Sequence, residues 1–255
     1  MTKISHITIF TIFIVLIISA LFAPISCSQQ IIFGTENHAP YNFINDETGK
    51  IEGLAVDVIK AMLVEAGDTE NKIKMFPWAR IYNMALEQKN VAIFSMSYTK
   101  ERDPLFKWVG ELHNSKSYLW KDSSRGDITI NSRQDLSKYK IVVQRNGGDH
   151  QIFKNEYGLK DNLHMVIDTQ QRYKLIFRGR GDLFAETPFT LKWQLGRDDY
   201  ENRIEKVYFI PEFGASLNLA FSNETDDIVV NRYKKALKQI KKNGTYQAII
   251  TKWTE

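Results

Sequence analysis

The sequence predicts an α/β fold built in two parts. Short apolar runs typical of buried strands alternate with segments whose apolar residues recur every three or four positions, as in amphipathic helices. A polar stretch at 122–131 separates a first set of these elements from a second. Removing the first 28 residues as an export signal leaves 227 of 255, enough for one large domain or two small ones. The order of the elements favours two.

The first set of elements alternates strands and helices. Residues 30–35 predict a strand, and apolar residues at helical spacing predict a helix over 54–66. Pro77 suits the first turn of a helix, where its missing N–H costs nothing, and 78–86 carry the apolar stripe of an amphipathic helix. The apolar run 91–95 predicts a strand buried on both faces.

The second set repeats this alternation, with helical segments between its strands. Its four strand candidates are 141–144, 164–167, 181–185 and 207–210. The tail predicts a helix that begins at Asp226 and Asp227 and ends in a basic turn before Gly244, in agreement with the helix dipole. Residues 246–253 predict one more short helix.

The composition excludes several classes of protein. With 43% hydrophobic and 25% charged residues, the chain is neither disordered, collagen-like nor a multi-span membrane protein. The 34 Lys and Arg residues face 30 Asp and Glu residues and form no basic block, which argues against nucleic-acid binding. The single cysteine, Cys27, excludes internal disulfides and a cysteine zinc cluster.

The amino terminus predicts an export signal. A basic start precedes the uncharged run 7–22, which is shorter than the roughly 20 residues of a membrane-spanning helix. We place cleavage after Ser28, so that 1–28 is the signal peptide and the mature protein works outside the cytoplasm. Two alternatives remain open: lipid attachment at Cys27, which Pro24 disfavours, and an uncleaved membrane anchor.

Motifs for common enzymes and metal sites do not occur. The sequence contains no nucleophile elbow, zinc-binding H-E-x-x-H helix or phosphate-binding glycine loop. Four histidines lie outside the signal: His38, His113, His150 and His164. Because none lies at metal-ligand spacing from another, each is expected to be a surface or turn residue. The sequence predicts neither a metal nor a cofactor.

The segment 95–102 is the best candidate for ligand chemistry. A predicted buried strand ends there in alternating hydroxyls, followed by a loop that carries Arg102. Open α/β sheets bind ligands at the carboxyl ends of their strands, and a guanidinium matches the planar shape of a carboxylate. Spacing alone leaves a second reading open, in which Arg102 is a solvated surface residue paired with Glu101 or Asp103.

Seven stretches, taken together and in order, carry a resemblance that spans nearly all of the mature chain. They are 34–41 (GTENHAPY), 49–57 (GKIEGLAVD), 77–80 (PWAR), 95–102 (SMSYTKER), 106–110 (FKWVG), 179–182 (GRGD) and 243–246 (NGTY). The chain resembles the periplasmic solute-binding proteins of polar amino-acid ABC transporters, a family also used as ligand-sensing modules.

The resemblance implies the type II periplasmic-binding-protein fold. Two α/β lobes would be joined by two hinge-crossing strands and would close over a ligand in the cleft between them. The first lobe would comprise 29–118 and the return segment 215–255, and the second lobe 119–214.

The resemblance also implies the function. The protein would capture a small amino-acid-like or carboxylate solute in the periplasm, as a monomer without nucleic acid, and present it to an ABC permease or membrane sensor. It would not be an enzyme. Two alternatives on the same fold remain open: a ligand-sensing module, and an exported dehydratase-type enzyme in which Glu36 and Glu186 could act as acid–base groups.

Position by position, the resemblance assigns a carboxylate clamp. Arg102 would grip the ligand carboxylate, with Ser95 and Ser97 assisting at the strand end. Gly147 and Gly148 would present backbone N–H groups to the same carboxylate from a helix start in the second lobe.

The resemblance further suggests the walls of the cleft. Trp78 would form one aromatic wall, although a core role is nearly as well supported by its place on the apolar helix face, and Tyr41 or His38 would form the other. Arg80 could supply a second cation or be a surface charge. Asn146 stands where the family usually has glycine, and asparagine tolerates the left-handed conformation that this turn needs.

One departure from the family pattern concerns the ligand ammonium. Amino-acid binders of the family usually hold it with an aspartate shortly after the Gly-Arg-x-Asp strand, but Thr187 occupies that position here, beside Glu186. Burying an ammonium without a carboxylate would cost several kcal/mol, so Glu36 or Glu186 is expected to replace the aspartate.

Overall fold

The computed structural model describes residues 30–68, 70–211 and 216–255. The predicted signal peptide 1–28, its cleavage after Ser28 and the lipid-attachment alternative at Cys27 all lie outside these residues. Within the described part of the chain, no helix has the length and apolar character that crossing a membrane would require.

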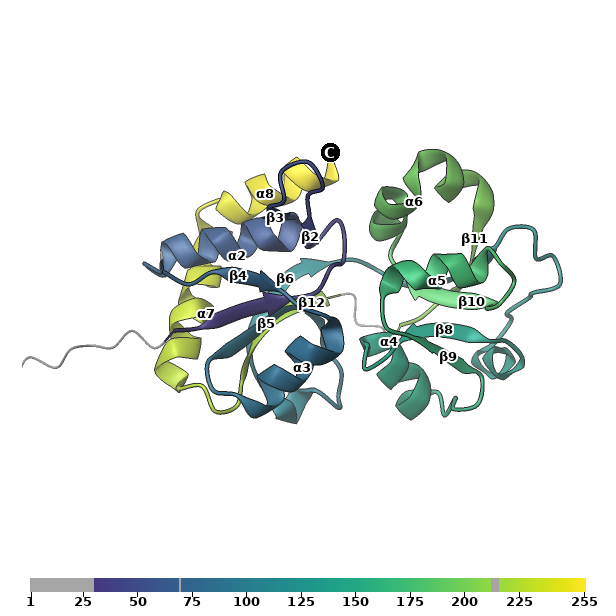
Figure 1. Ribbon diagram of the computed structural model, residues 1–255, viewed down its shortest axis with the longest axis horizontal. Coiled ribbons are helices and arrows are strands. Elements are labelled where there is room, and N and C mark those ends of the chain that lie inside the picture. Colours follow the sequence, from purple (N-terminus) through teal and green to yellow (C-terminus); the bar gives the residue numbers. More distant parts are fainter. Residues whose placement is uncertain (1–29, 69, 212–215) are drawn as a thin grey trace, which may run out of the picture.

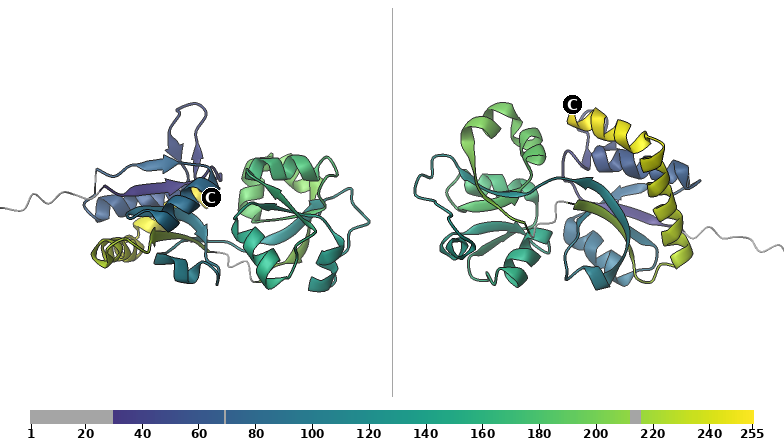
Figure 2. Two further views of the ribbon diagram at one scale, coloured as in Figure 1. Left: turned by 60° about the horizontal axis from the view of Figure 1, so that its bottom comes forward. Right: turned by 180° about the vertical axis from the view of Figure 1, so that it is seen from behind.

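The chain forms two lobes side by side, each built on a five-stranded sheet with helices against it (Figure 1). The views from other sides show the same separation, with the first and last parts of the chain together in one lobe (Figure 2). The predicted α/β fold with two lobes is therefore confirmed. The domain bounds 29–118, 119–214 and 215–255 stay a prediction.

The sheet of the first lobe is mixed. Its strands, in spatial order, are β4 (Ile73–Met75), β1 (Ile32–Thr35), β5 (Val91–Ser97), β12 (Ser216–Ser222) and β6 (Phe106–Asn114). Strand β1 is parallel to both β4 and β5, whereas β12 is antiparallel to β5 and β6. A small hairpin of β2 (Phe43–Ile44) and β3 (Ile51–Glu52) lies outside this sheet.

The sheet of the second lobe has the same number of strands. They are, in spatial order, β11 (Ile204–Phe209), β7 (Tyr118–Asp122), β10 (Leu183–Glu186), β8 (Ile141–Gln144) and β9 (Leu163–Val166). Strand β8 is parallel to β9 and β10, and β7 is antiparallel to β10 and β11. The chain enters this sheet at β7, directly after β6, and has returned to the first sheet at β12.

Helices cover both faces of the first sheet (Figure 1). Helices α2 (Leu54–Glu65), α7 (Asp227–Lys242) and α8 (Thr245–Thr254) pack on one face, and α3 (Trp78–Glu87) packs on the other. The second lobe carries these helices: α4 (Gly148–Gln151), α5 (Thr169–Ile176), α6 (Pro188–Arg203), the 3-10 helix Arg133–Lys138 and the π-helical turn Ile152–Glu156. One 3-10 turn, Asp103–Leu105, follows β5.

The arrangement of parallel strands determines where a ligand can bind. Because β1 and β5 run parallel, their carboxyl ends meet at one edge of the first sheet. The parallel strands β8 and β10 end together in the same way, at Gln144 and Glu186. Carboxyl ends of strands are where open α/β sheets bind ligands.

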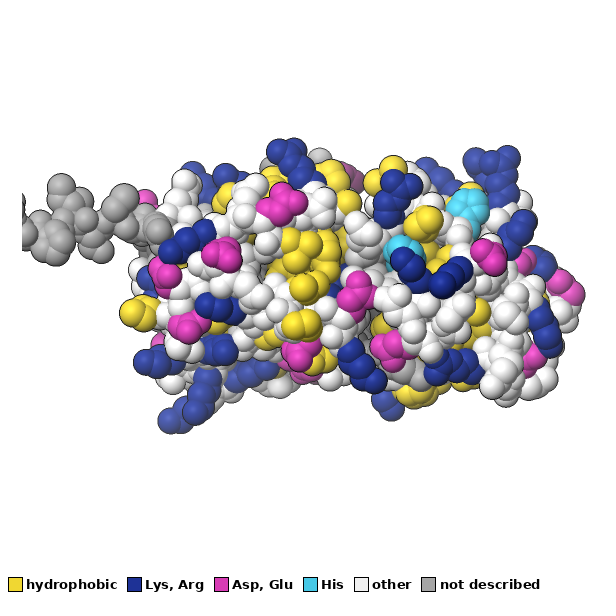
Figure 3. Space-filling model, turned by 90° about the horizontal axis from the view of Figure 1, so that it is seen from below, with side chains coloured by type: hydrophobic (Ala, Val, Ile, Leu, Met, Phe, Trp, Pro, Cys, Tyr) yellow, Lys and Arg dark blue, Asp and Glu magenta, His cyan; other side chains and the backbone are white. Residues whose placement is uncertain are grey.

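The charged residues form no basic block on the surface shown in Figure 3, as the near balance of Lys and Arg against Asp and Glu suggests. On the face seen from below, lysines and arginines are interspersed with acidic residues, and no large patch of one sign forms (Figure 3). Hydrophobic side chains gather near the middle of that face, beside the boundary between the lobes.

Gly53, the residue before α2, is required by close packing as well as by its backbone conformation. Its φ is 135°, and a Cβ there would lie 2.3 Å from the carbonyl oxygen of Tyr41. Gly49 also has a positive φ, 66°, but a Cβ there would have no neighbour within 4 Å.

We therefore predict that Gly53→Ala lowers the free energy of unfolding by about 2–5 kcal/mol, because it combines backbone strain with a steric clash. The matched variant Gly49→Ala should cost only about 1–2 kcal/mol, since it carries the strain alone. Urea unfolding of both variants measures the difference, and equal losses would contradict the packing argument.

Candidate functional site

A cavity of about 60 Å³ lies where the strand ends of the two lobes face each other. Nine of the twelve predicted site residues line it: Glu36, His38, Trp78, Ser95, Ser97, Arg102, Gly147, Gly148 and Glu186. The cavity is also lined by residues that the sequence analysis did not select, notably Gln144, Asp149, Thr169 and Arg172.

Arg102 is fully buried, which excludes the alternative of a solvated surface residue. One guanidinium nitrogen donates to the carbonyl of Ser97, at 2.9 Å, and the other to the carbonyl of Asn146 in the second lobe, at 2.8 Å. The guanidinium carbon lies 5.2 Å from the ring centres of Trp78 and Tyr82. Burial lowers the pKa of Arg102 from its ordinary value, but arginine remains a cation in proteins.

Asn146 connects the two lobes through its backbone. Its φ of 59° is left-handed, as expected for asparagine at this turn. The carbonyl that this turn presents accepts hydrogen bonds from Arg102 and from the indole Nε1 of Trp78, both at 2.8 Å. Two first-lobe side chains therefore hold one second-lobe carbonyl.

The residues predicted to bind the ligand carboxylate together with Arg102 differ in whether their polar groups are free to do so. Ser95 has a φ of 59° at a register shift of the ladder with β12, and its hydroxyl donates to the buried amide of Asn42. The N–H of Gly147 donates to the carbonyl of Gln144, at 2.8 Å, so it is not available to a ligand. A Cβ on Gly148 would lie 3.0 Å from Cβ of Ser97, so glycine lets the lobes approach here.

Three predicted site residues do not line the cavity. Arg80 is exposed, with its guanidinium carbon 5.5 Å from the ring centre of Phe76. The hydroxyl of Thr187 caps α6 by accepting from the N–H of Thr190, at 3.1 Å. Tyr41 is 1% exposed and lies behind His38, with ring centres 5.3 Å apart. Of the two residues predicted for the second wall, His38 is the one that lines the cavity.

Two of the four histidines, His38 and His113, are largely buried and correct the expectation that each is a surface or turn residue, whereas His164 is exposed as expected. His113 is only 8% exposed and packs against the rings of Tyr41 and Phe189. His38 retains 16% exposure and faces Glu186. Among the described residues, no group of His, Cys, Asp and Glu side chains has the arrangement of a metal site.

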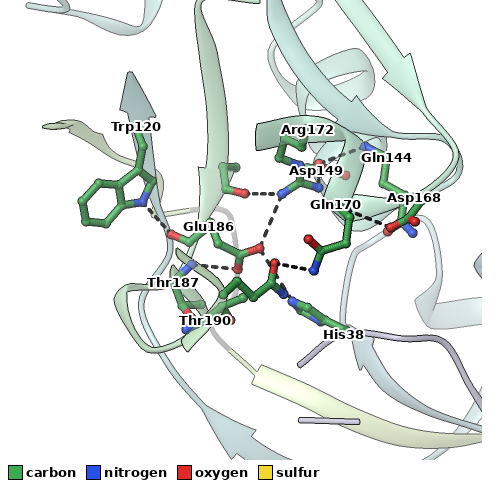
Figure 4. A network of polar contacts seen from close by, with 12 residues as sticks. His38, Trp120, Gln144, Asp149, Asp168, Gln170, Arg172, Glu186, Thr187 and Thr190 are labelled. Atoms are coloured by element: carbon green, nitrogen blue, oxygen red, sulfur yellow. Dashed lines mark hydrogen bonds and ion pairs between the residues drawn. The ribbon is translucent and has the colours of Figure 1, made fainter. Parts of the chain in front are cut away.

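A network of buried charges forms the second-lobe side of the cavity (Figure 4). Arg172, on α5, is 4% exposed and donates to Asp149, at 3.0 Å, and to the carbonyl of Ala185, at 2.6 Å. It also lies 3.5 Å from Glu186, which His38 approaches from the first lobe at 3.6 Å. Arg172 therefore stands between two carboxylates.

Glu36 and Glu186 are in contrasting environments. Burial raises the pKa of Glu36, although His38 and the hydrogen bond from Gln144, at 2.5 Å, act in the opposite direction. Burial would also raise the pKa of Glu186, but His38 and Arg172 outweigh it and lower the pKa below its ordinary value. Glu186 is thus already matched by cations, whereas Glu36 is not.

Four residues that line the cavity carry a buried polar atom without a hydrogen-bond partner in the described part of the chain. These atoms are Nε of Arg102, Nε of Arg172, Oγ1 of Thr169 and Nε2 of His38, of which the last still lies 3.6 Å from Glu186 as an ion pair. Buried polar groups in native proteins are almost always hydrogen-bonded, so a concentration of partnerless ones marks a place where another molecule can bind. Nε of Arg102 and Nε of Arg172 are both hydrogen-bond donors, which suits a ligand rich in acceptor atoms.

Of the cavity residues that the sequence analysis missed, some could have been selected by a sequence rule and others could not. Gln144 ends a correctly predicted strand, so the strand-end rule that selected Arg102 could have selected it too. Thr169 and Arg172 lie in the first turns of a polar helix, TQQRYKLI, and nothing in that pattern distinguishes them from solvated residues.

A two-lobed α/β protein whose interlobe cavity concentrates partnerless polar atoms belongs to the class of ligand-binding proteins. Residues 31–255 match the family of bacterial extracellular solute-binding proteins, family 3, and the chain belongs to this family.

Curated relatives agree with this assignment, and solved structures agree with the fold. The arginine-binding periplasmic protein of Mannheimia haemolytica is 25% identical over 235 residues, which cover 89% of this chain and 91% of that protein. A histidine kinase sensor domain similar to periplasmic binding proteins has a TM-score of 0.76 at 19% identity, covering 89% of this chain and 96% of that one. The ancestral amino-acid-binding protein AncCDT-1, a precursor of cyclohexadienyl dehydratase, has a TM-score of 0.72 at 21% identity, covering 89% and 95%.

The pair of His38 and Glu186 leads to a pH-dependent prediction. Burial alone would lower the pKa of His38, but the charges of Glu186 and Glu36 outweigh it and raise the pKa above its ordinary value of 6.5. A raised pKa in the folded state means that the stabilisation is complete below pH 6.5 and is lost as the pH rises through the folded-state pKa.

We expect His38→Gln to lower the free energy of unfolding by about 1–3 kcal/mol at a pH about one unit below that ordinary value. The difference should shrink as the pH rises through the raised pKa of His38 in the folded protein, because the imidazole then loses its proton. Urea unfolding of both proteins at this pH and at a pH above that raised pKa tests this. A difference that is unchanged or larger at the higher pH would contradict the ion pair.

Proposed function

We propose that this protein captures a small amino-acid-like or carboxylate solute between its lobes and delivers it to an ABC permease. It would act in the periplasm after removal of 1–28, as a monomer and without turnover. The observation that carries this proposal is the group of partnerless buried donors around the cavity, centred on Arg102. The amino-acid ligands named for the relatives support the same class of solute.

A ligand carboxylate would complete the hydrogen bonding of Arg102. Its two terminal nitrogens donate to carbonyls, but no carboxylate of the described residues lies within 4.0 Å of the guanidinium, which is the distance of an ion pair. Burying a cation without an anion costs several kcal/mol, and a bound carboxylate offsets that cost. The hydroxyl of Thr169 is a further donor on the cavity wall.

We assign the ligand ammonium to Glu36 and not to Glu186. One oxygen of Glu186 accepts from the N–H of Thr187, at 2.9 Å, and the other faces His38 and Arg172. Glu36 accepts a hydrogen bond from the neutral amide of Gln144 and, among the described residues, forms no ion pair within 4.0 Å, although the charge of His38 acts on it from further away. An ammonium beside Glu36 would supply one and take the place of the family aspartate.

Contacts between the lobes support trapping of the ligand by closure. Besides the hydrogen bonds to Asn146, the amide of Gln194 donates to the carbonyl of Ala39, at 2.9 Å. Trp193 of α6 also contacts Phe43 and Trp253 of the first lobe, with ring centres 5.7 and 5.8 Å away. A permease would recognise this closed form.

The carboxylate clamp is tested by changing two arginines. Arg102→Gln should weaken binding of the best-bound solute more than 100-fold, because a buried ion pair with one partner removed loses about 3–5 kcal/mol. Arg178→Gln is the matched control: it removes an exposed arginine that does not line the cavity and should leave affinity unchanged. Thermal shift with the standard L-amino acids and short carboxylates identifies the solute, and isothermal titration calorimetry gives the affinities.

Arg102→Lys adds a variant that keeps the charge but loses the planar fork. It should bind more weakly than wild type and more tightly than Arg102→Gln. Urea unfolding checks that each variant is folded. Full ligand-induced stabilisation of folded Arg102→Gln would refute the clamp, and conversion of the solute into a product, seen by mass spectrometry, would favour the dehydratase alternative.

The contribution of closure is tested at a residue outside the cavity. Trp193→Ala removes two aromatic contacts between the lobes worth about 0.5–1.5 kcal/mol each, so we expect affinity to fall at least about fivefold. The stoichiometry of binding should not change. Ile228→Ala, at a residue that is 85% exposed, serves as the control and should have no effect. An unchanged affinity of Trp193→Ala would argue against these contacts as part of closure.

A further inference from the structure

A groove of about 390 Å³ lies beside the cavity, between residues of both lobes. The cavity and the groove share two lining residues, Glu36 and Trp78, so the two spaces lie next to each other at these side chains. Apolar side chains supply most of the remaining groove wall: Ile44, Met75, Phe76 and Pro77 from the first lobe, and Ile167 from the second.

We propose that this groove is a subsite for the apolar side chain of the same solute whose charged head group occupies the cavity. The ligand class is then an amino acid with a neutral aliphatic or aromatic side chain. This inference rests on the proposed function and adds the part of the ligand that decides specificity.

The volumes of the cavity and the groove indicate which part of the ligand each would hold. A water needs about 10–15 Å³ of such space, so the 60 Å³ cavity holds only a few heavy atoms, as in a carboxylate and an amino group. The 390 Å³ groove falls within the range of about 300–1,000 Å³ that is usual for small-molecule sites. A ligand held by Arg102 and Glu36 would therefore extend along Trp78 into the groove.

Covering the groove would be favourable because the groove exposes large hydrophobic side chains to water. Ile44 is 46% exposed and Ile167 is 62% exposed, although both are large hydrophobic residues. They border the groove from opposite lobes, so an apolar side chain between them would remove both from water. The same contact would bridge the lobes and stabilise the closed form.

With Glu36 assigned to the ligand ammonium, the charges of Arg80 and Asp168 around the groove oppose each other, which suits a neutral side chain. The exposed guanidinium of Arg80 packs over the ring of Phe76, one wall of the groove, and would repel a second cation. Asp168 borders the groove directly and brings a carboxylate of the opposite sign, one oxygen of which accepts from the N–H of Gln170, at 2.8 Å. Glu36, the other acid, is assigned to the ligand ammonium.

A homologous series of ligands tests the subsite. Alanine, 2-aminobutyrate, norvaline and norleucine share one head group and differ by single methylenes. We expect the affinity measured by calorimetry to rise about three- to fourfold with each methylene, the value for transfer of a methylene from water. Arginine, whose longer side chain ends in a cation, should bind more weakly than norleucine.

Two variants test whether the gain in affinity along the series comes from the groove. One changes Ile167, which directly follows β9, and the other changes Met165 within β9. Ile167→Ser should weaken norleucine binding by about three- to tenfold and leave alanine binding unchanged, because only the longer side chain reaches this residue. Met165→Ser is the matched control, since Met165 is 47% exposed on β9 but does not line the groove. It should not change either affinity.

The possible results separate the subsite from the proposed function. If alanine binds in an Arg102-dependent way but affinity does not rise along the series, the subsite is refuted and the clamp stands. Tighter binding of arginine than of norleucine, or an equal effect of Ile167→Ser and Met165→Ser, also refutes the subsite. If neither the series nor arginine binds, both proposals fail.

Discussion

The guanidinium of Arg102 is a buried positive charge that the described part of the chain leaves without a carboxylate, and the other features of the site follow from it. Its position depends on β5, which ends at the cleft, and on the rings of Trp78 and Tyr82 beside it. A carbonyl of the second lobe accepts one of its hydrogen bonds. The state of the cleft and the solvation of this charge are therefore coupled: opening the lobes would break that hydrogen bond.

In the second lobe, by contrast, the buried arginine is paired with carboxylates. This arginine, Arg172, is balanced by Asp149 and Glu186, so this network needs no ligand to neutralise it. His38 and Glu36 extend the network into the first lobe through Glu186 and Gln144. A ligand thus enters between an uncompensated cation and a nearly balanced set of charges. Such an environment suits a zwitterion better than a molecule with a large net charge.

The sequence predicted those features that depend on local pattern. Apolar runs located β1, β5, β8 and β10, and the strand-end rule then selected Ser97 and Arg102. The antiparallel strand β12 was not predicted, since it reaches β5 and β6 only through long-range pairing. Likewise, a polar helix pattern cannot show that Arg172 turns inward.

Both the cavity and the groove have walls from the two lobes, so recognition and closure use the same contacts. A ligand that fits only the polar cavity would contact the charges but leave Ile44 and Ile167 exposed. One that also fills the groove would add apolar contacts that exist only in the closed form, and a ligand can shift a two-state equilibrium only by its differential affinity for the two states. The carboxylate clamp, common to many amino acids, would therefore supply capture. The groove would decide which of them closes the protein most completely.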